Sequence, residues 1–151
     1  MVINAPKNLP VRPTTDKVKE SLFNVIQNKF EINDCRVLDI FSGTGNISKP
    51  FREAGHTVWD VDVVPRFFPE TCMDILQWDY TKLQFIPDVI WASPPCDQYA
   101  RCRTTGPPRN FALANKLVAK AIEIITYFQK LDADLIWFLE NGDSTLLWAG
   151  T

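Results

Sequence analysis

The stretch Leu38-Asp-Ile-Phe-Ser-Gly-Thr-Gly-Asn46 indicates the fold of this chain more clearly than any other part of the sequence. The residues that lead into it, 36–41, are apolar enough to form a strand buried on both faces of a sheet. Gly43 and Gly45 then allow a tight turn and a close approach of the backbone to a ligand. A helix is expected from about Asn46 to Ala54. A strand, a glycine turn and a helix in this order predict an α/β fold with a ligand at the turn.

Strands and helices continue to alternate along the rest of the chain. Further strands are predicted at residues 57–62, 72–75, 88–92 and 134–139. Apolar residues at helical spacing mark a long amphipathic helix before the last strand: Leu113, Leu117, Ala121, Ile124, Ile125 and Phe128. Alternation of this kind is typical of a parallel sheet with helices on its faces. We therefore predict an α/β, Rossmann-like sheet, mostly parallel, with the spatial strand order 3-2-1-4-5.

One domain is predicted over residues 1–151. Residues 1–34 form an extended arm and a helix that Thr14 or Thr15 can cap, and residues 35–151 form the α/β core. Only ten residues follow Asn141 in the chain of 151, so we expect the sheet to be truncated after its fifth strand. That strand would present an apolar exposed edge, through which the chain can pair with another copy.

Composition excludes several classes of protein. With 46% hydrophobic and 23% charged residues, the chain is an ordinary globular protein and not a disordered one. Its formal net charge of -2 gives no overall attraction to nucleic acid, so any such affinity needs a local patch. Arg101, Arg103 and Arg109 form a cluster that is either such a patch or a solvated surface.

The cysteines and the single histidine indicate the compartment. No pair of the four cysteines has C-x-x-C spacing and His56 is the only histidine, so we expect no metal site. The first apolar run is interrupted by Asn4, Lys7 and Asn8, and no apolar stretch reaches the length of a membrane span. We therefore expect a cytoplasmic protein with reduced thiols.

Acidic residues follow the predicted strands at the positions where open α/β sheets bind ligands. Asp39 immediately precedes the glycine turn, and an acid ending the second strand can accept hydrogen bonds from both hydroxyls of a ribose. Asp62 is the better candidate for that role and Asp60 the alternative, because strand alternation puts both on one face. After the third strand, Asp74 and Ile75 offer one polar and one apolar contact to an adenine.

These motifs resemble the class I S-adenosylmethionine-dependent methyltransferases in order and spacing. The resemblance implies S-adenosyl-L-methionine as cofactor, with the glycine turn under its methionine part, Asp62 on its ribose, and Asp74 with Ile75 at its adenine. The cofactor-binding residues that it implies are Asp39, Phe41, Ser42, Gly43, Thr44, Gly45, Asn46, Asp62, Asp74, Ile75 and Pro94.

The run Ala92-Ser-Pro-Pro-Cys-Asp-Gln-Tyr99 follows the fourth predicted strand. Its two prolines fix the backbone and direct Cys96 toward the carboxyl edge of the sheet. Either Cys96 is a buried structural cysteine, as most such cysteines are, or it is a nucleophile whose pKa Arg101 and Arg103 lower. The arginines and the facing ligand turn favour the nucleophile.

Glu140 ends the fifth predicted strand. A glutamate at such a position is often only a capping or surface group. If it is buried beside Cys96, its pKa would be raised and it would carry a proton at neutral pH.

Pro-Pro-Cys96 followed by Glu140-Asn141 resembles the cytosine-C5 methyltransferases, most closely the small phage-type DNA enzymes, over roughly residues 36–141. The resemblance implies that the Cys96 thiolate adds to C6 of cytosine while protonated Glu140 donates to N3. C5 then takes the methyl group, and loss of its proton releases the enzyme. DNA is the implied partner, with the base flipped out of the duplex, and Arg101, Arg103 and Arg109 are its expected contacts. Because only ten residues follow Asn141, we expect no target-recognition region of the kind that such DNA enzymes add.

The front of the chain points to another family. Residues 12–24, Arg-Pro-Thr-Thr-Asp-Lys-Val-Lys-Glu-Ser-Leu-Phe-Asn, and the sequence onward to Asn46 resemble the ribosomal RNA guanine-N2 methyltransferases. That family carries Asp-Pro-Pro-Tyr after its fourth strand, where this chain has Ser93 and Cys96. An RNA methyltransferase is therefore the alternative function, and a cofactor-binding module without turnover is a further one.

Overall fold

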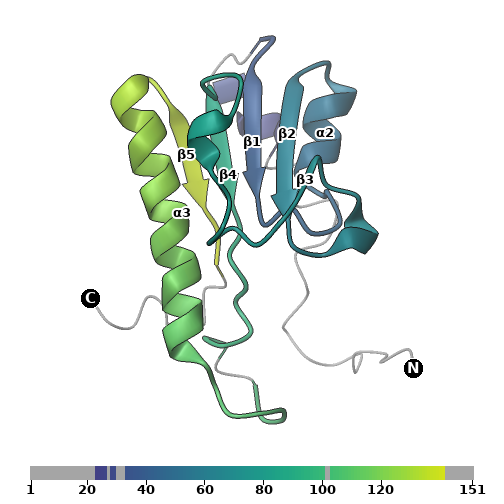
Figure 1. Cartoon of the computed structure of the whole chain (residues 1–151). Helices are drawn as coiled ribbons and strands as arrows, with labels where there is room; N and C mark the ends of the chain where they lie inside the picture. Colours follow the sequence, from purple (N-terminus) through teal and green to yellow (C-terminus); the bar gives the residue numbers. More distant parts are fainter. Residues whose placement is uncertain (1–22, 27, 30–32, 101–102, 142–151) are drawn as a thin grey trace.

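A five-stranded parallel sheet forms the centre of the molecule (Figure 1). In the computed structural model the described residues are 23–26, 28–29, 33–100 and 103–141. The strands lie in the order β3-β2-β1-β4-β5, and every neighbouring pair is parallel. Their bounds are β1 (Arg36–Ile40), β2 (Thr57–Asp62), β3 (Thr71–Cys72), β4 (Val89–Ala92) and β5 (Ile136–Leu139). The predicted fold class and strand order are confirmed.

Alternation along the strands gives the sheet two apolar faces. Leu38 and Ile40 of β1 lie on one face with Ile90 of β4, and they pack against Ala121 and Ile124 of the long helix α3 (Phe111–Leu131). Because every member of this cluster is buried, it forms the larger part of the core. Most of the apolar stripe predicted from helical spacing meets the sheet, namely Ala121, Ile124, Ile125 and Phe128 with the partly buried Leu117, whereas Leu113 is 46% exposed.

The opposite face of the sheet packs against the short helix α2 (Ser48–Glu53). Val37 of β1 and Val89 of β4 contact Phe51 of α2 in a second buried cluster. Residues 23–26 and 28–29 are helical and add Phe23 and Ile26 to this cluster. The rest of the predicted N-terminal helix lies outside the described residues.

Two elements differ from their predicted bounds. Strand β3 has two residues, whereas residues 72–75 were predicted, because the Asp74 side chain accepts a hydrogen bond from the Leu76 amide and turns the chain. Helix α2 begins at Ser48, two residues later than predicted, because the amide of Gly45 bonds the carbonyl of Ser42 in the preceding turn.

Helix α3 extends past the carboxyl edge of the sheet with its N-terminal turns (Figure 1). Asn110 caps this end, since its side-chain oxygen accepts a hydrogen bond of 3.0 Å from the Leu113 amide. The first turns of α3 therefore stand beside the loops that follow β1, β2 and β4. No helix in the described part of the chain is long and apolar enough to cross a membrane.

Candidate active site

The glycine turn is held against β2 and opens toward empty space. The amides of Phe41 and Ser42 both donate to the Val61 carbonyl, at 2.9 and 3.2 Å. Gly43 and Gly45 adopt φ of 53° and 75°, a left-handed conformation that side chains disfavour. A Cβ on either glycine would meet no atom within 4 Å, so the protein does not fill the space beside the turn. The turn can therefore receive a ligand along its backbone.

Asp62 and Asp60 are the two candidates for the residue that accepts hydrogen bonds from a ribose, and their surroundings distinguish them. Asp60 is 5% exposed, and its carboxylate bonds Arg52 at 3.3 Å and the Glu70 amide at 2.8 Å. The carboxylate of Asp62 faces a cavity and accepts bonds of 2.8 Å from the amides of Gly43 and Val64. Each Asp62 oxygen keeps acceptor capacity for a hydroxyl group. Asp62 is thus positioned to bind a ligand while it joins the loops after β1 and β2.

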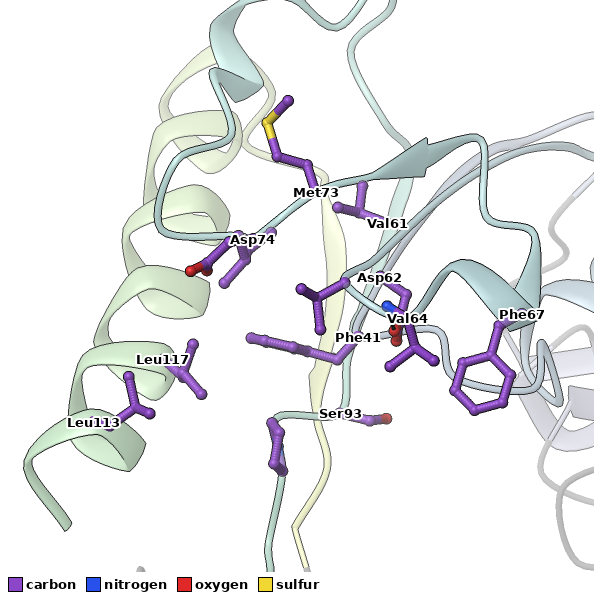
Figure 2. Close-up of a pocket in the computed structure, with 13 residues that line it drawn as sticks. Phe41, Val61, Asp62, Val64, Phe67, Met73, Asp74, Ser93, Leu113 and Leu117 are labelled. Carbon is purple, nitrogen blue, oxygen red and sulfur yellow. Dashed lines mark hydrogen bonds between the residues drawn. The ribbon is translucent and has the colours of Figure 1, made fainter. Parts of the chain in front are cut away.

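The cavity beside Asp62 has a volume of about 350 Å³, in the range of small-molecule sites. Figure 2 shows Phe41 at its centre, with Leu113 and Leu117 of α3 on one side and Phe67 on the other. The lining is largely apolar, and it includes Asp74 and the buried Ile75. Helical spacing predicts that Leu113 and Leu117 belong to the apolar stripe of α3, but it does not indicate that they line a cavity.

A second, more polar hollow of about 180 Å³ lies over the glycine turn. It shares Phe41 and Ser93 with the larger cavity, so the two adjoin. Its lining residues are Asp39, Phe41, Ser42, Gly43, Thr44, Asn46, Ile47, Ser93 and Glu140.

Asp39 is the most deeply buried acid of the site, with 1% of its surface exposed. Burial raises its pKa to about 7, and the nearby charge of Asp60 acts in the same direction. The Ser48 hydroxyl opposes this shift by donating a hydrogen bond of 2.6 Å to the carboxylate. Sequence reasoning identified Asp39 but not Ser48, because the pairing depends on how α2 packs against β1.

Cys96 stands at the same edge of the sheet as the glycine turn. Ser93 continues β4, since its amide donates to the Ile40 carbonyl of β1 at 3.1 Å. Ser93 and Pro95 line the larger cavity, whereas Pro94 between them is buried. Cys96 is exposed, so it is not the buried structural cysteine of the alternative interpretation.

Glu140 differs from expectation. Its amide extends the pairing of β5 by donating to the Ala92 carbonyl at 2.8 Å. Its side chain lines the polar hollow, but the residue is exposed. Glu140 is therefore not buried beside Cys96, because the end of β5 lies at the edge of the sheet.

The expected nucleic-acid arginines have partners within their own loop. Arg103 donates to the side-chain oxygen of Gln98 at 2.9 Å and to the Pro107 carbonyl at 2.7 Å. Arg109 donates to backbone carbonyls of the turn after Cys96. Both guanidinium groups thus help to organise the loop, and their contact with nucleic acid stays a prediction. Arg101 lies outside the described residues.

Comparisons with known proteins bear on this site. A family model described as "Conserved hypothetical protein 95" matches residues 2–50. The chain is 33% identical over 124 residues to a probable DNA (cytosine-5)-methyltransferase of frog virus 3, covering 72% of this chain and 54% of that protein. It is 31% identical over 102 residues to the 23S rRNA (uracil(1939)-C(5))-methyltransferase RlmD of Shewanella woodyi, covering 56% of this chain and 23% of that protein. Both relatives are methyltransferases by their names, and this chain is similar to them over these spans. It spans about half the length of its viral relative.

That relationship implies S-adenosylmethionine as cofactor, and the residues present suit this molecule. Its adenine needs an apolar cavity, its ribose needs an acceptor for two hydroxyls, and its charged amino-acid end needs a polar hollow. The larger cavity, Asp62 and the hollow above Asp39 offer these features side by side. The space beside Gly43 and Gly45 is open and adds room at the polar hollow.

Proposed function

We propose that this chain is a methyltransferase that acts on C5 of a pyrimidine, with cytosine in DNA as its substrate and Cys96 as its nucleophile. The position of Cys96 carries the proposal. It follows Pro95, which lines the cavity, and it is exposed at the edge of the sheet where the glycine turn lies. Both named relatives are C5 methyltransferases of pyrimidines, which adds support.

Two residues of this chain have roles in the proposed reaction. The Cys96 thiolate adds to C6 of cytosine, which forms a sulfur–carbon bond and makes C5 nucleophilic. Glu140, in its protonated form, donates to N3 and neutralises the charge that develops there. The bound cofactor supplies the methyl group that C5 takes up. Loss of the C5 proton to a base and cleavage of the sulfur–carbon bond then return Cys96 to its thiolate form.

The proposal requires Glu140 to lose solvent when substrate binds. Glu140 lines the hollow that adjoins the cavity through Ser93. A base that reaches from Cys96 into this hollow would cover the carboxyl group. Covering a carboxyl group with an aromatic ring removes water and favours the protonated form.

Trapping on fluorinated DNA tests the proposed mechanism. With 5-fluorocytosine in the target, C5 carries fluorine in place of the hydrogen that must leave as a proton. We therefore expect an adduct between the chain and the DNA that withstands denaturing electrophoresis, and peptide mass spectrometry should locate it at Cys96. The adduct should require S-adenosylmethionine and be absent with unmodified DNA. Methyl transfer to unmodified DNA without any such adduct would contradict the mechanism.

A second candidate substrate is uracil in RNA, favoured by the resemblance to RlmD. The thiolate step at C6 is the same for both bases, so Cys96 does not distinguish them. RNA that contains 5-fluorouridine should be trapped in preference to fluorinated DNA if this candidate is correct. Guanine-N2 methylation is disfavoured, because Ser93 and Cys96 replace the acid and the aromatic residue that this chemistry uses in the resembling family.

Asp62→Ala should weaken binding of S-adenosylmethionine by about 1.5–3 kcal/mol, the usual contribution of hydrogen bonds to a charged group. The substitution also removes the acceptor of the Gly43 amide and so loosens the turn. Isothermal titration with S-adenosylhomocysteine measures the change. Asp79→Ala is the control, because Asp79 lies outside both cavities and bonds Thr81 and Lys82. Equal affinities for the Asp62→Ala variant and the unmodified chain would remove Asp62 from the site.

A further inference from the structure

Cys96 begins a short turn that fixes its backbone. The amides of Tyr99 and Ala100 both donate to the Cys96 carbonyl, at 3.0 and 2.9 Å. A single turn in an exposed loop has little stability of its own, because nucleating a turn costs more than one hydrogen bond returns. The orientation of the thiol therefore depends on what holds the far end of the turn.

Arg109 holds that end. Its Nη1 donates to the Gln98 carbonyl at 2.6 Å, and its Nη2 donates to the Ala100 carbonyl at 2.8 Å and the Arg103 carbonyl at 3.3 Å. The Gln98 and Ala100 carbonyls lie at the end of this turn, and the Ala100 carbonyl also accepts a bond of 3.2 Å from the Arg103 amide. The planar guanidinium group reaches several acceptors at once in a fixed geometry, which an ammonium group does not reproduce.

The turn is also fastened to the start of α3. The side-chain oxygen of Gln98 accepts a bond of 2.7 Å from the Asn110 amide. Tyr99 is 3% exposed and donates a bond of 2.6 Å to Asn115. Its ring packs with Ala114 of α3 in a small buried cluster. Arg109 directly precedes the N-cap of α3, so its bonds to the Gln98 and Ala100 carbonyls join the start of the helix to the Cys96 turn.

We propose that Arg109 is a positioning residue, which holds the Cys96 turn against α3 and so orients the thiol, and that it is not a phosphate contact. The inference rests on the proposed function only in so far as Cys96 is the nucleophile. Turning the Arg109 guanidinium group toward a phosphate would weaken its bonds to the Gln98, Ala100 and Arg103 carbonyls, which hold the end of the turn. The loop is thus built around this guanidinium group.

Replacement by lysine separates the two roles. Arg109→Lys keeps the positive charge that a phosphate contact needs, but it loses the bonds to several carbonyls at once. We expect kcat to fall by about tenfold or more, as misplaced reacting groups cause, while KM and the DNA dissociation constant change by less than about twofold. The rate at which iodoacetamide alkylates Cys96, followed by peptide mass spectrometry, should change to a similar extent in Arg109→Lys and Arg109→Ala.

Arg36→Lys is the matched control. Arg36 lies at the amino-terminal end of β1, away from the carboxyl edge of the sheet where Cys96 lies, and its guanidinium group bonds Asp88. We expect this variant to keep kcat and the Cys96 alkylation rate within about twofold. Gln98→Ala removes the link to Asn110 and leaves the Gln98 carbonyl in place, so it should show a smaller version of the Arg109→Lys effect. It also provides the test if Arg109→Lys does not fold.

The opposite pattern would overturn the proposal. A phosphate contact predicts that Arg109→Lys retains kcat and alkylation, whereas Arg109→Ala binds DNA more weakly with a salt slope reduced by about one. The alkylation measurement needs neither substrate nor turnover. If only the proposed function is wrong, methyl transfer is absent but the variants still show the expected differences in Cys96 alkylation. If the positioning role is wrong, Cys96 of the Arg109→Lys variant is alkylated at the same rate as in the unmodified chain.

Discussion

Cys96→Ser is expected to abolish methyl transfer and trapping on fluorinated DNA while leaving the affinity for S-adenosylhomocysteine nearly unchanged. The replacement is almost the same size, but an alcohol is far less ionised near neutral pH than a thiol and adds poorly to C6. Cys96 itself lines neither cavity, whereas Pro95 lines the larger one, so cofactor contacts should persist. Radiolabelled methyl transfer and isothermal titration measure the two properties.

Cys72→Ser provides the matched control. Cys72 is also exposed, but it ends β3 and bonds only weakly to the Val63 carbonyl at 3.9 Å. Activity and trapping should survive its loss. Cys35 supplies an internal reference for alkylation, because burial raises its pKa to about 11 and its thiolate is scarce at neutral pH. Measurable methylation by the Cys96→Ser variant would dismiss the nucleophile and, with it, the C5 mechanism.

The sheet could be predicted because its central strands, β1 and β4, are buried on both faces. Residues 89–92 form a continuous apolar run, and residues 36–40 are largely apolar, so both indicate buried strands. Strand β3 lies at the edge and pairs through only two residues. A strand of that length leaves almost no periodic signal, and the side chain of Asp74 determines where it ends.

The candidate site was predictable where a residue type and a strand end together define a role. Asp62 and the glycine turn follow this rule. The exposure of Glu140 could not be predicted in this way, because it depends on which element covers the end of β5 and not on the position of Glu140 in the chain. The local role of Arg109 could not be predicted either, since its acceptors are backbone carbonyls, which sequence patterns do not distinguish.

Asp39→Asn is expected to remove a pH dependence of stability that the unmodified chain shows between pH 5 and 8. Burial raises the pKa of Asp39 to about 7, above the value of about 3.9 for an unfolded aspartate. The folded chain therefore holds this proton more tightly than the unfolded chain. Its contribution to the free energy of unfolding is fully present below about pH 4 and is lost as the pH rises toward 7. Between pH 5 and 8 the loss should be on the order of 2 kcal/mol.

Urea denaturation at pH 5, 6, 7 and 8 measures this slope in the two chains. The asparagine oxygen still accepts the Ser48 hydroxyl bond, so the local structure should persist. Asp88→Asn is the control: the pKa of Asp88 is lowered by its hydrogen bonds from Arg36, so it is already ionised throughout this range. That variant should be less stable at every pH, with the slope unchanged. Parallel curves for the unmodified chain and Asp39→Asn would mean that Asp39 is ionised at pH 5. The acid beneath the glycine turn would then be charged before any cofactor arrives, and burial would not govern its protonation.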